Sequence, residues 1–168
     1  MTTLQLNSSK IKVFLTKKIF SITSEGKIVL RIIFGPMKKV MPFQRNDFDA
    51  VKKLLIEGFS SKFKNDINEN FFLLNNYGFV LKEDEKLLGF ASIHVINKIN
   101  RVSCLIEDVV IDSNYRGKGL GKLLINHLIK FSKTLGSDKI ILNSQESNTK
   151  FYEKLGFKKN ETQMIIRL

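Results

Sequence analysis

The 168-residue sequence has little cysteine, little proline and no long apolar run. Cys104 is the only cysteine, so no internal disulfide can form, which excludes a disulfide scaffold and fits a reducing compartment. Only two prolines accompany 43% hydrophobic residues, a composition from which we expect a folded chain. Because no apolar run approaches the roughly 20 residues that cross a bilayer, we expect a soluble, cytoplasmic protein with no membrane partner.

Acidic residues are also few, which leaves a formal net charge of +12. Residues 1–40 carry eight Lys or Arg against one acid, and residues 114–139 carry six against Asp138. Such a surface attracts polyanions in general, and charge alone does not choose between nucleic acid, an acidic membrane and a phosphate-rich cofactor. The 14 phenylalanines fall mostly in predicted core stripes rather than in basic and aromatic clusters. We therefore expect no nucleic-acid partner.

The length predicts one compact domain, since single domains commonly contain about 100 to 200 residues. We interpret residues 1–26 as an N-terminal extension and residues 27–168 as the domain. Lysines among Ser and Thr near the N-terminus are one feature of a transit peptide. That stretch has no Arg and no clear amphipathic pattern, however, which favours a plain extension.

Hydrophobic periodicity predicts strands and helices in the first two thirds of the chain. The predicted strands are 27–34, 40–43, 78–81, 87–96 and 102–111. The third and fourth form a hairpin about the charged turn Lys82–Lys86. Asn46 or Asp47 can cap a helix whose apolar stripe ends at Phe59, and a second helix is predicted over 65–75.

The last third of the chain is more regular. An apolar stripe from Leu120 to Leu135 predicts a helix that ends at Gly136. A strand, a helix and a closing strand are then predicted over 139–142, 147–155 and 164–168. The order of elements predicts an α/β fold with a mixed sheet.

A glycine-rich segment lies between the strand that ends near Ile111 and the helix that begins near Gly119. It reads Arg116-Gly117-Lys118-Gly119-Leu120-Gly121-Lys122. Successive glycines let backbone N–H groups turn toward one point, and a helix N-terminus adds partial positive charge, so the segment suits a pyrophosphate. A P-loop would need Ser or Thr where Leu123 stands, and a Rossmann turn would need another glycine spacing. A flexible basic loop is the alternative, but the strand-to-helix junction favours a ligand site.

Two segments resemble signatures of one enzyme superfamily. Arg116-x-x-Gly119-x-Gly121 is similar to the segment with which GNAT N-acetyltransferases hold the pyrophosphate of coenzyme A, and residues 148–157 (NTKFYEKLGF) are similar to a second GNAT segment. The resemblance implies a GNAT acetyltransferase fold, in which a central, mostly antiparallel, twisted sheet is splayed in the middle and has helices on both faces. It also implies acetyl-coenzyme A as the acyl donor and a primary amine as the acceptor.

By this resemblance, coenzyme A lies along the end of the strand predicted over 102–111, the glycine-rich segment and the helix of the second motif. The residues expected to bind it are Val109, Val110, Ile111, Arg116, Gly117, Lys118, Gly119, Leu120, Gly121, Lys122, Asn143, Asn148, Phe151 and Tyr152. Tyr152 is expected to point its hydroxyl at the sulfur, where it stabilises or protonates the departing thiolate. A lone Tyr on a helix is otherwise more often a core residue.

From Leu105 to the C-terminus, the sequence is most similar to the glucosamine-6-phosphate N-acetyltransferases, although Leu105 and Asn143 replace their usual His and acidic residue. The similarity implies that Glu107 and Asp108 contact the sugar and that one of them orients or deprotonates the amine. Adjacent strand residues normally point to opposite faces, so one of these carboxylates could simply be solvated. A β-bulge would re-aim them, and bulges are common beside active sites.

The same similarity implies further substrate contacts at Asp138 and Lys139. It also implies that Arg167 reaches the sugar phosphate from the neighbouring subunit of a homodimer, a role that suits the planar guanidinium, which can bond two phosphate oxygens. The product would enter the synthesis of UDP-N-acetylglucosamine. A protein N-terminus, a lysine or another small amine is the alternative acceptor.

We expect direct transfer in a ternary complex. The neutral amine attacks the thioester carbonyl, a backbone N–H of the strand around 109–110 stabilises the oxyanion, and Tyr152 assists the leaving sulfur. Cys104 lies in an apolar run with no evident base, which favours burial over an acyl-carrier role. His94 and His127 form no cluster with other ligand residues, so we predict no metal.

Overall fold

The computed structural model describes residues 18–22, 28–32, 36–59, 68–73 and 75–166. The chain divides into two units, Met1–Met37 and Lys38–Leu168. In the first unit, strand β1 (Lys18–Ile22) pairs antiparallel with strand β2 (Ile28–Ile32). β2 confirms a predicted strand, whereas β1 lies within the stretch interpreted as an extension. The domain boundary placed after position 26 stays a prediction.

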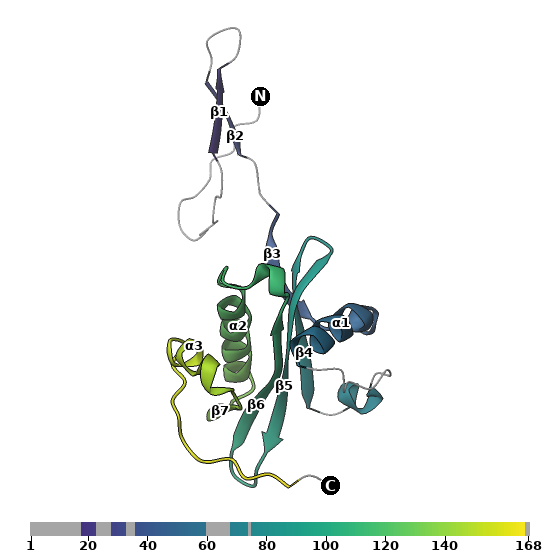
Figure 1. Ribbon diagram of the computed structural model, residues 1–168, viewed down its shortest axis with the longest axis vertical. Coiled ribbons are helices and arrows are strands. Elements are labelled where there is room, and N and C mark those ends of the chain that lie inside the picture. The colour runs from purple at the N-terminus through teal and green to yellow at the C-terminus, as the bar shows by residue number, and fades with distance from the viewer. Residues whose placement is uncertain (1–17, 23–27, 33–35, 60–67, 74, 167–168) are drawn as a thin grey trace. The chain divides into compact units, whose positions relative to one another are not determined.

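One five-stranded sheet with the order β3-β4-β5-β6-β7 forms the centre of the second unit (Figure 1). Its strands are β3 (Lys38–Pro42), β4 (Asn76–Glu83), β5 (Lys86–Asn97), β6 (Val102–Ile111) and β7 (Lys139–Leu142). Neighbours pair antiparallel from β3 to β6, and β7 pairs parallel with β6. This mixed sheet confirms the predicted fold class, and β4 and β5 form the predicted hairpin.

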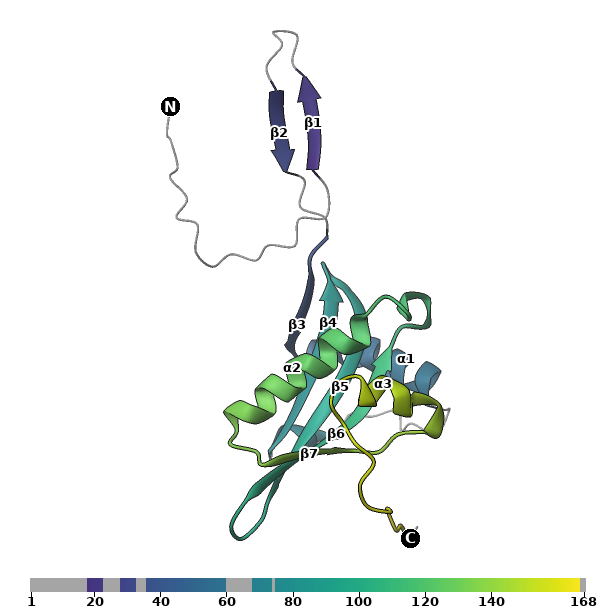
Figure 2. The same ribbon diagram turned by 90° about the vertical axis from the view of Figure 1, so that its left-hand side faces the viewer.

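Helices α1 (Phe48–Gly58) and α2 (Leu120–Thr134) cover opposite faces of this sheet (Figures 1 and 2). Residues of α1 share a buried cluster with Phe90 of β5, whereas residues of α2 share one with Ala91, the next residue along the strand. Because strand side chains alternate between faces, each helix has its own apolar core. The sheet is therefore buried on both sides.

Two glycines set the ends of α2. Gly119 immediately precedes the helix with a φ of 77°, and Gly136 follows it with a φ of 69°. Residues with a Cβ adopt this left-handed region only at a cost, so glycine is suited to both termini. Between them the buried stripe contains Leu120, Leu124 and Leu128, which confirms the helix predicted from the sequence.

Shorter helical segments connect the main elements. They are η1 (Arg45–Asp47), η2 (Glu69–Phe72), η3 (Ser113–Tyr115), η4 (Glu146–Asn148) and α3 (Thr149–Glu153). The helix predicted over 65–75 is wrong in the described residues 68–73, which form only the turn η2. There Phe71 and Phe72 both pack against the ring of Phe43, so the tight turn places both rings in one aromatic cluster.

The closing strand predicted over 164–168 is also wrong in its described part. Residues 164–166 form no strand, and their apolar side chains are largely exposed. Figure 2 shows the yellow tail passing the sheet without an arrow. Alternating apolar residues fit a strand only when a neighbouring strand supplies hydrogen bonds, and this segment makes no such pairing within the described chain.

β6 and β7 separate partway along the sheet. Their pairing runs from Ser103 opposite Lys139 to Ile106 opposite Leu142. β6 then continues to Ile111, still paired with β5, while the chain leaves the sheet after Leu142. The sheet is thus splayed, and a gap opens beside the second half of β6.

Candidate active site

A pocket of about 850 Å³ occupies the gap between β6 and β7. Its volume lies within the usual range of small-molecule sites, roughly 300–1,000 Å³. Most residues predicted to bind coenzyme A or the amine line it: Glu107, Asp108, Val109, Val110, Ile111, Arg116, Gly117, Gly119, Leu120, Gly121, Lys122, Asn143, Asn148, Phe151 and Tyr152. The two sequence motifs therefore meet at one cavity.

A β-bulge in β6 brings both carboxylates to this pocket. Phe90 of β5 pairs with Val110, but Ser92 pairs with Glu107, so β6 has one extra residue over this stretch. Asp108 has a φ of 56°, in the left-handed region that residues other than glycine seldom adopt. The bulge breaks the alternation that would send Glu107 and Asp108 to opposite faces.

Asp108 and Glu107 have different surroundings. Ser92 Oγ donates a hydrogen bond to Asp108 Oδ2 at 3.3 Å. Burial raises the pKa of the Asp108 carboxyl above its ordinary value, while the hydrogen bond from Ser92 and the nearby His94 ring act in the opposite direction. Glu107 instead accepts a hydrogen bond from Asn143 Nδ2 at 3.3 Å. A half-buried carboxylate with a raised pKa is the better suited of the two to accept a proton near neutral pH.

The glycine-rich bend presents backbone rather than side chains. Gly117 and Gly119 have φ values of 74° and 77°, and no atom lies within 4 Å of the place where a Cβ would stand. The N–H groups in the first turn of α2 have no acceptor within the helix, so they are available to an anion. At Gly121 a Cβ would lie 3.2 Å from Phe151 Cζ, so this glycine lets α2 and α3 approach each other.

The second half of β6 directs further N–H groups into the gap. Asp112 N–H donates to Leu88 O of β5 at 2.9 Å, and Arg116 Nε donates to Ile111 O at 3.1 Å. N–H groups alternate between the two sides of a strand. Those of Val109 and Ile111 therefore point away from β5, toward the pocket. The alternation favours Val109 over Val110 as a donor to a bound carbonyl.

Tyr152 lies on α3 and lines the pocket. Its ring makes edge contacts with Phe151 and Phe157, with centroids 4.9 and 5.9 Å away. Burial raises the pKa of the Tyr152 hydroxyl, so the group stays protonated at neutral pH and can donate. Asn148 ends η4, one residue before α3, and also lines the pocket.

Among the described residues, three predicted site residues do not line this pocket. Lys118 places its ammonium over the ring of Tyr115, 4.8 Å from the centroid. Asp138 and Lys139 lie at the start of β7, at the end of the strand opposite the gap. Arg167 lies outside the described residues.

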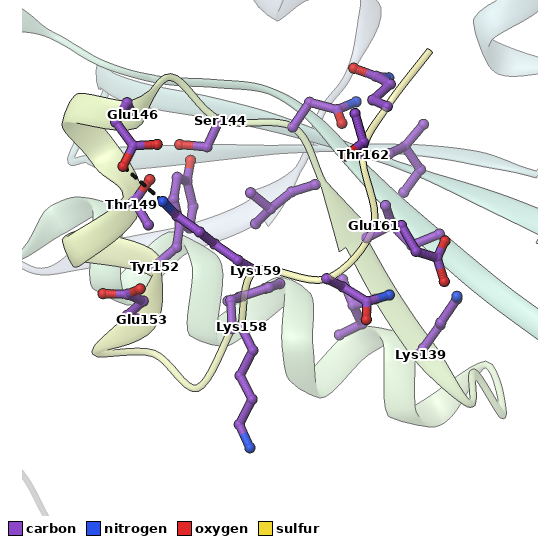
Figure 3. A pocket seen from close by; sticks show the side chains of 18 of the residues that line it. Lys139, Ser144, Glu146, Thr149, Tyr152, Glu153, Lys158, Lys159, Glu161 and Thr162 are labelled. Atoms are coloured by element: carbon purple, nitrogen blue, oxygen red, sulfur yellow. Dashed lines mark hydrogen bonds and ion pairs between the residues drawn. The ribbon is translucent and has the colours of Figure 1, made fainter.

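A second pocket, of about 810 Å³, lies along β7 and residues 157–163. Figure 3 shows Tyr152 and Lys139 on opposite sides of it, and an ion pair of 2.8 Å between Lys159 and Glu146. Tyr152 lines both pockets. β7 is the last strand of the sheet in the described chain, so this pocket borders its open edge.

Three polar residues that the sequence motifs do not mark lie next to the bulge, on β4 and β5. His94 Nδ1 lies 2.7 Å from Asn76 Oδ1, and His94 Nε2 lies 3.1 Å from Ser92 Oγ. A signal for them exists, because Ser92 and His94 are polar residues two apart in an otherwise apolar run, which places them on one face of a strand. Phe59 and Gln145 also line the pocket, and no motif marks them.

The described residues contain neither a metal cluster nor a membrane-spanning helix. No group of three or more His, Cys, Asp and Glu residues in this part of the chain is placed to hold a metal ion. None of the described helices has both the length and the apolar character that crossing a membrane requires. Cys104 is fully buried in the core, which agrees with a structural role.

Comparisons with known proteins give consistent results. A sequence model of the acetyltransferase (GNAT) family matches residues 44–157. The glucosamine 6-phosphate N-acetyltransferase of Trypanosoma brucei brucei is 45% identical over 86 residues, which cover 49% of this chain and 58% of that protein. Glucosamine 6-phosphate N-acetyltransferase 1 of Dictyostelium discoideum is 48% identical over 63 residues, 38% of this chain and 40% of that one. The chain thus spans about half the length of the curated relatives it matches.

Solved structures resemble more of the chain. A crystal structure of a Trypanosoma brucei acetyltransferase has a TM-score of 0.70 at 30% identity, covering 79% of this chain and 100% of that one. The crystal structure of glucosamine-6-phosphate N-acetyltransferase from Arabidopsis thaliana has a TM-score of 0.69 at 26% identity, covering 78% and 98%.

Proposed function

Because the chain belongs to the acetyltransferase (GNAT) family, we propose that it transfers the acetyl group of acetyl-coenzyme A to the 2-amine of D-glucosamine 6-phosphate. The product is N-acetyl-D-glucosamine 6-phosphate. The observation that carries this proposal is the pocket at the β6–β7 gap, which unites amides suited to a diphosphate with two carboxylates suited to an amine. The names of the curated relatives supply the identity of the acceptor.

The glycine-rich bend is the proposed site for the diphosphate of coenzyme A. The first-turn N–H groups of α2 and the positive end of the helix dipole both favour an anion there. Lys122, exposed in the same turn and lining the pocket, adds positive charge. Because the side chains of Gly117 and Gly119 are absent, phosphate oxygens can reach the backbone directly.

Asp108 is the proposed general base. An aliphatic amine is mostly an ammonium ion at neutral pH, so it must lose a proton before it can attack the thioester. Asp108 combines access to the pocket with a raised pKa, both of which favour proton transfer from the ammonium. Glu107, held by Asn143, orients the sugar beside it.

Two donors then act on the charge that develops. The N–H of Val109 is oriented toward the gap, where it stabilises the oxyanion formed when the amine adds to the carbonyl. The Tyr152 hydroxyl donates to the sulfur as the carbon–sulfur bond breaks. Acetyl transfer is direct in this scheme, because buried Cys104 is not accessible as a carrier.

The decisive experiment is a thiol-release assay with acetyl-coenzyme A and a panel of amines. The panel contains glucosamine 6-phosphate, glucosamine, free lysine and short peptides with free N-termini. Turnover of glucosamine 6-phosphate well above that of glucosamine supports the proposal, because only the former carries a phosphate. Turnover of peptides alone would instead favour the second candidate, acetylation of a protein amine, for which the names of the relatives give no support.

We also propose a homodimer in which Arg167 reaches the phosphate in the partner's pocket. In the described chain, β7 is an edge strand, and Met164, Ile165 and Ile166 expose apolar side chains that a second copy would cover. Asp138 and Lys139 do not line the pocket at the β6–β7 gap, and Lys139 instead lines the pocket along the open edge of β7, where a second copy would lie.

Subunit mixing tests this arrangement. Arg167→Ala is expected to raise the KM for glucosamine 6-phosphate much more than that for acetyl-coenzyme A. When Arg167→Ala chains are mixed with Tyr152→Phe chains, each mixed dimer regains one complete site, so activity should exceed that of either variant alone. A light-scattering mass of a monomer, or no recovery on mixing, contradicts the proposal.

A further inference from the structure

A row of hydrogen bonds leads away from the pocket behind Asp108. Ser92 Oγ lies 3.3 Å from Asp108 Oδ2 and 3.1 Å from His94 Nε2. His94 Nδ1 in turn lies 2.7 Å from Asn76 Oδ1. The groups come from three neighbouring strands, because Asn76 of β4 is the register partner of His94 on β5, and Asp108 belongs to β6. The row therefore spans three of the five strands of this sheet.

Packing alone does not call for polar residues here. Ser92 is completely buried, on the same face of β5 as Phe90. On the other face, Ala91 and Ile93 fill equivalent positions with apolar side chains. A buried hydroxyl stabilises nothing unless it is hydrogen-bonded, and leaving it unpaired costs about 1–3 kcal/mol. A function for the polar row accounts for its presence better than stability does.

The contact with Asn76 favours one tautomer of His94. Asn76 Oδ1 has no proton, so the short contact requires that His94 Nδ1 donate. In a neutral imidazole the other nitrogen, Nε2, is then an acceptor. Ser92 has one hydroxyl proton and two neighbours, the Asp108 carboxyl and His94 Nε2. When Asp108 is protonated, Ser92 accepts a hydrogen bond from it and donates to His94 Nε2. When the proton is on His94 instead, Nε2 donates to Ser92 and Ser92 donates to the Asp108 carboxylate.

We propose that Ser92 and His94 form a proton relay that carries the proton of the acceptor amine from Asp108 away from the pocket, with Asn76 as a positioning residue. This inference rests on the proposed function. Acetyl transfer from the ammonium form yields an amide, a thiol and one free proton, so that proton must leave the site. The protonated Asp108 gives its proton to Ser92 Oγ while Ser92 gives its own to His94 Nε2. Asp108 is a carboxylate again, and the imidazolium releases the proton to solvent.

Two other titratable groups of the described chain face the pocket beside the relay. Glu107 is adjacent to Asp108 on β6, and Tyr152 faces the same pocket from α3. From η2, the uncharged ring of Phe71 packs edge-on against the His94 ring, with centroids 6.1 Å apart. The neutral amide of Asn76 faces His94 from β4.

Variants of Ser92 and His94 test the relay. His94→Gln and Ser92→Ala are each expected to lower kcat by about 10- to 100-fold at pH 6.5, a general acid–base effect. KM for acetyl-coenzyme A should change less than about twofold, because neither residue lines the pocket. The double variant should be no slower than the slower single variant, because both changes cut one path. As the pH rises toward 9, the amine arrives already neutral, so the defects should shrink.

Two control variants keep the test sharp. Ser92→Thr retains a hydroxyl on the strand and should keep kcat within about threefold of the wild type. His127→Gln changes the other histidine, which packs against Phe79 in the core under α2, and should leave the pH profile unchanged. Losses that multiply in the double variant, or that are equal at every pH, would overturn the relay, and so would a slow Ser92→Thr variant.

The wild-type enzyme tests the proposed function separately. If it acetylates another amine of the panel but not glucosamine 6-phosphate, the proposed acceptor is wrong. The relay is then judged with that amine, because the path begins at Asp108 and does not involve the sugar. Wild-type protein that acetylates no amine in the panel would overturn both proposals.

Discussion

The two ends of β6 differ in their strand pairing and in what their side chains contact. From Ser103 to Ile106 the strand pairs with β5 on one side and β7 on the other, and Cys104 and Ile106 are buried. From Glu107 to Ile111 it pairs only with β5 and contains the bulge. The first end is mostly core, whereas every residue of the second end lines the pocket, including Val110, which is also buried against α1. In this strand, the candidate site begins at Ile106, the last residue that pairs with β7.

The second end departs from the usual strand pattern in three ways. It breaks the alternation of side chains, it places Asp108 at a positive φ, and it partly buries a carboxylate. Each departure costs free energy. Such costs are typical of functional sites, where geometry takes precedence over stability. Substitutions at the two ends should therefore affect different measurements.

Asp108→Asn, at the pocket end, should have the largest effect on catalysis. It removes the proposed base while keeping size and shape, so kcat should fall by about 10²- to 10⁴-fold. Steady-state rates and thermal melting of the same preparation check this, with little loss of stability expected. Glu107→Gln is the matched comparison, because it neutralises the adjacent carboxylate. A larger fall in kcat for Glu107→Gln would show that Glu107, not Asp108, is the general base.

Ile93→Ala tests the core end. Ile93 is fully buried and pairs with Ile106 across β5 and β6, on the face under α2. Truncating a buried isoleucine costs about 2–5 kcal/mol of unfolding free energy. Urea titrations should show this loss, while kcat at a temperature where the variant is folded stays within about threefold of the wild type. A large fall in kcat would contradict the expectation that substitutions at the core end affect stability and not catalysis.

Tyr152→Phe should have a smaller effect on the pocket end. Removing the hydroxyl leaves the ring contacts with Phe151 and Phe157 in place, so the fold should be retained. Loss of the donor to the leaving sulfur should lower kcat by about 10- to 1,000-fold. Thiol release measured in a single turnover checks the chemical step directly. An unchanged rate would make Tyr152 a packing residue.

The contrast between the two ends also explains what the sequence could predict. The stripe from Leu120 to Leu135 and the hairpin about Lys82–Lys86 follow local periodicity and turn chemistry, and the structure contains both. The glycine-rich segment was recognisable because glycines at a helix start have a local physical meaning. Such features depend on neighbours in the sequence.

Features that depend on distant strands were harder to predict. The bulge at Asp108 is visible only when β5 is aligned beside β6. The row of Asn76, Ser92 and His94 needs the register of three strands. The strand expected over 164–168 had the right alternation, but alternation cannot supply a pairing partner.

The smallest expected effect concerns stability and pH at Asp108. Its folded pKa is raised, so the native state favours the protonated form. The resulting stabilisation is fully present below the unfolded pKa, about 3.9, and is lost as the pH rises through the folded value. Asparagine never ionises, so the stability of Asp108→Asn relative to the wild type should increase over this window and then level off.

Urea unfolding at a series of pH values measures this difference. Asp84→Asn is the matched control, because Asp84 has a φ of 52° but an exposed side chain in the β4–β5 turn. It shows what asparagine contributes in a left-handed conformation without burial. If the gain from Asp108→Asn were constant with pH, backbone preference alone would account for it. The backbone at Asp108 would then be strained, but the partial burial of its carboxylate would cost no measurable free energy.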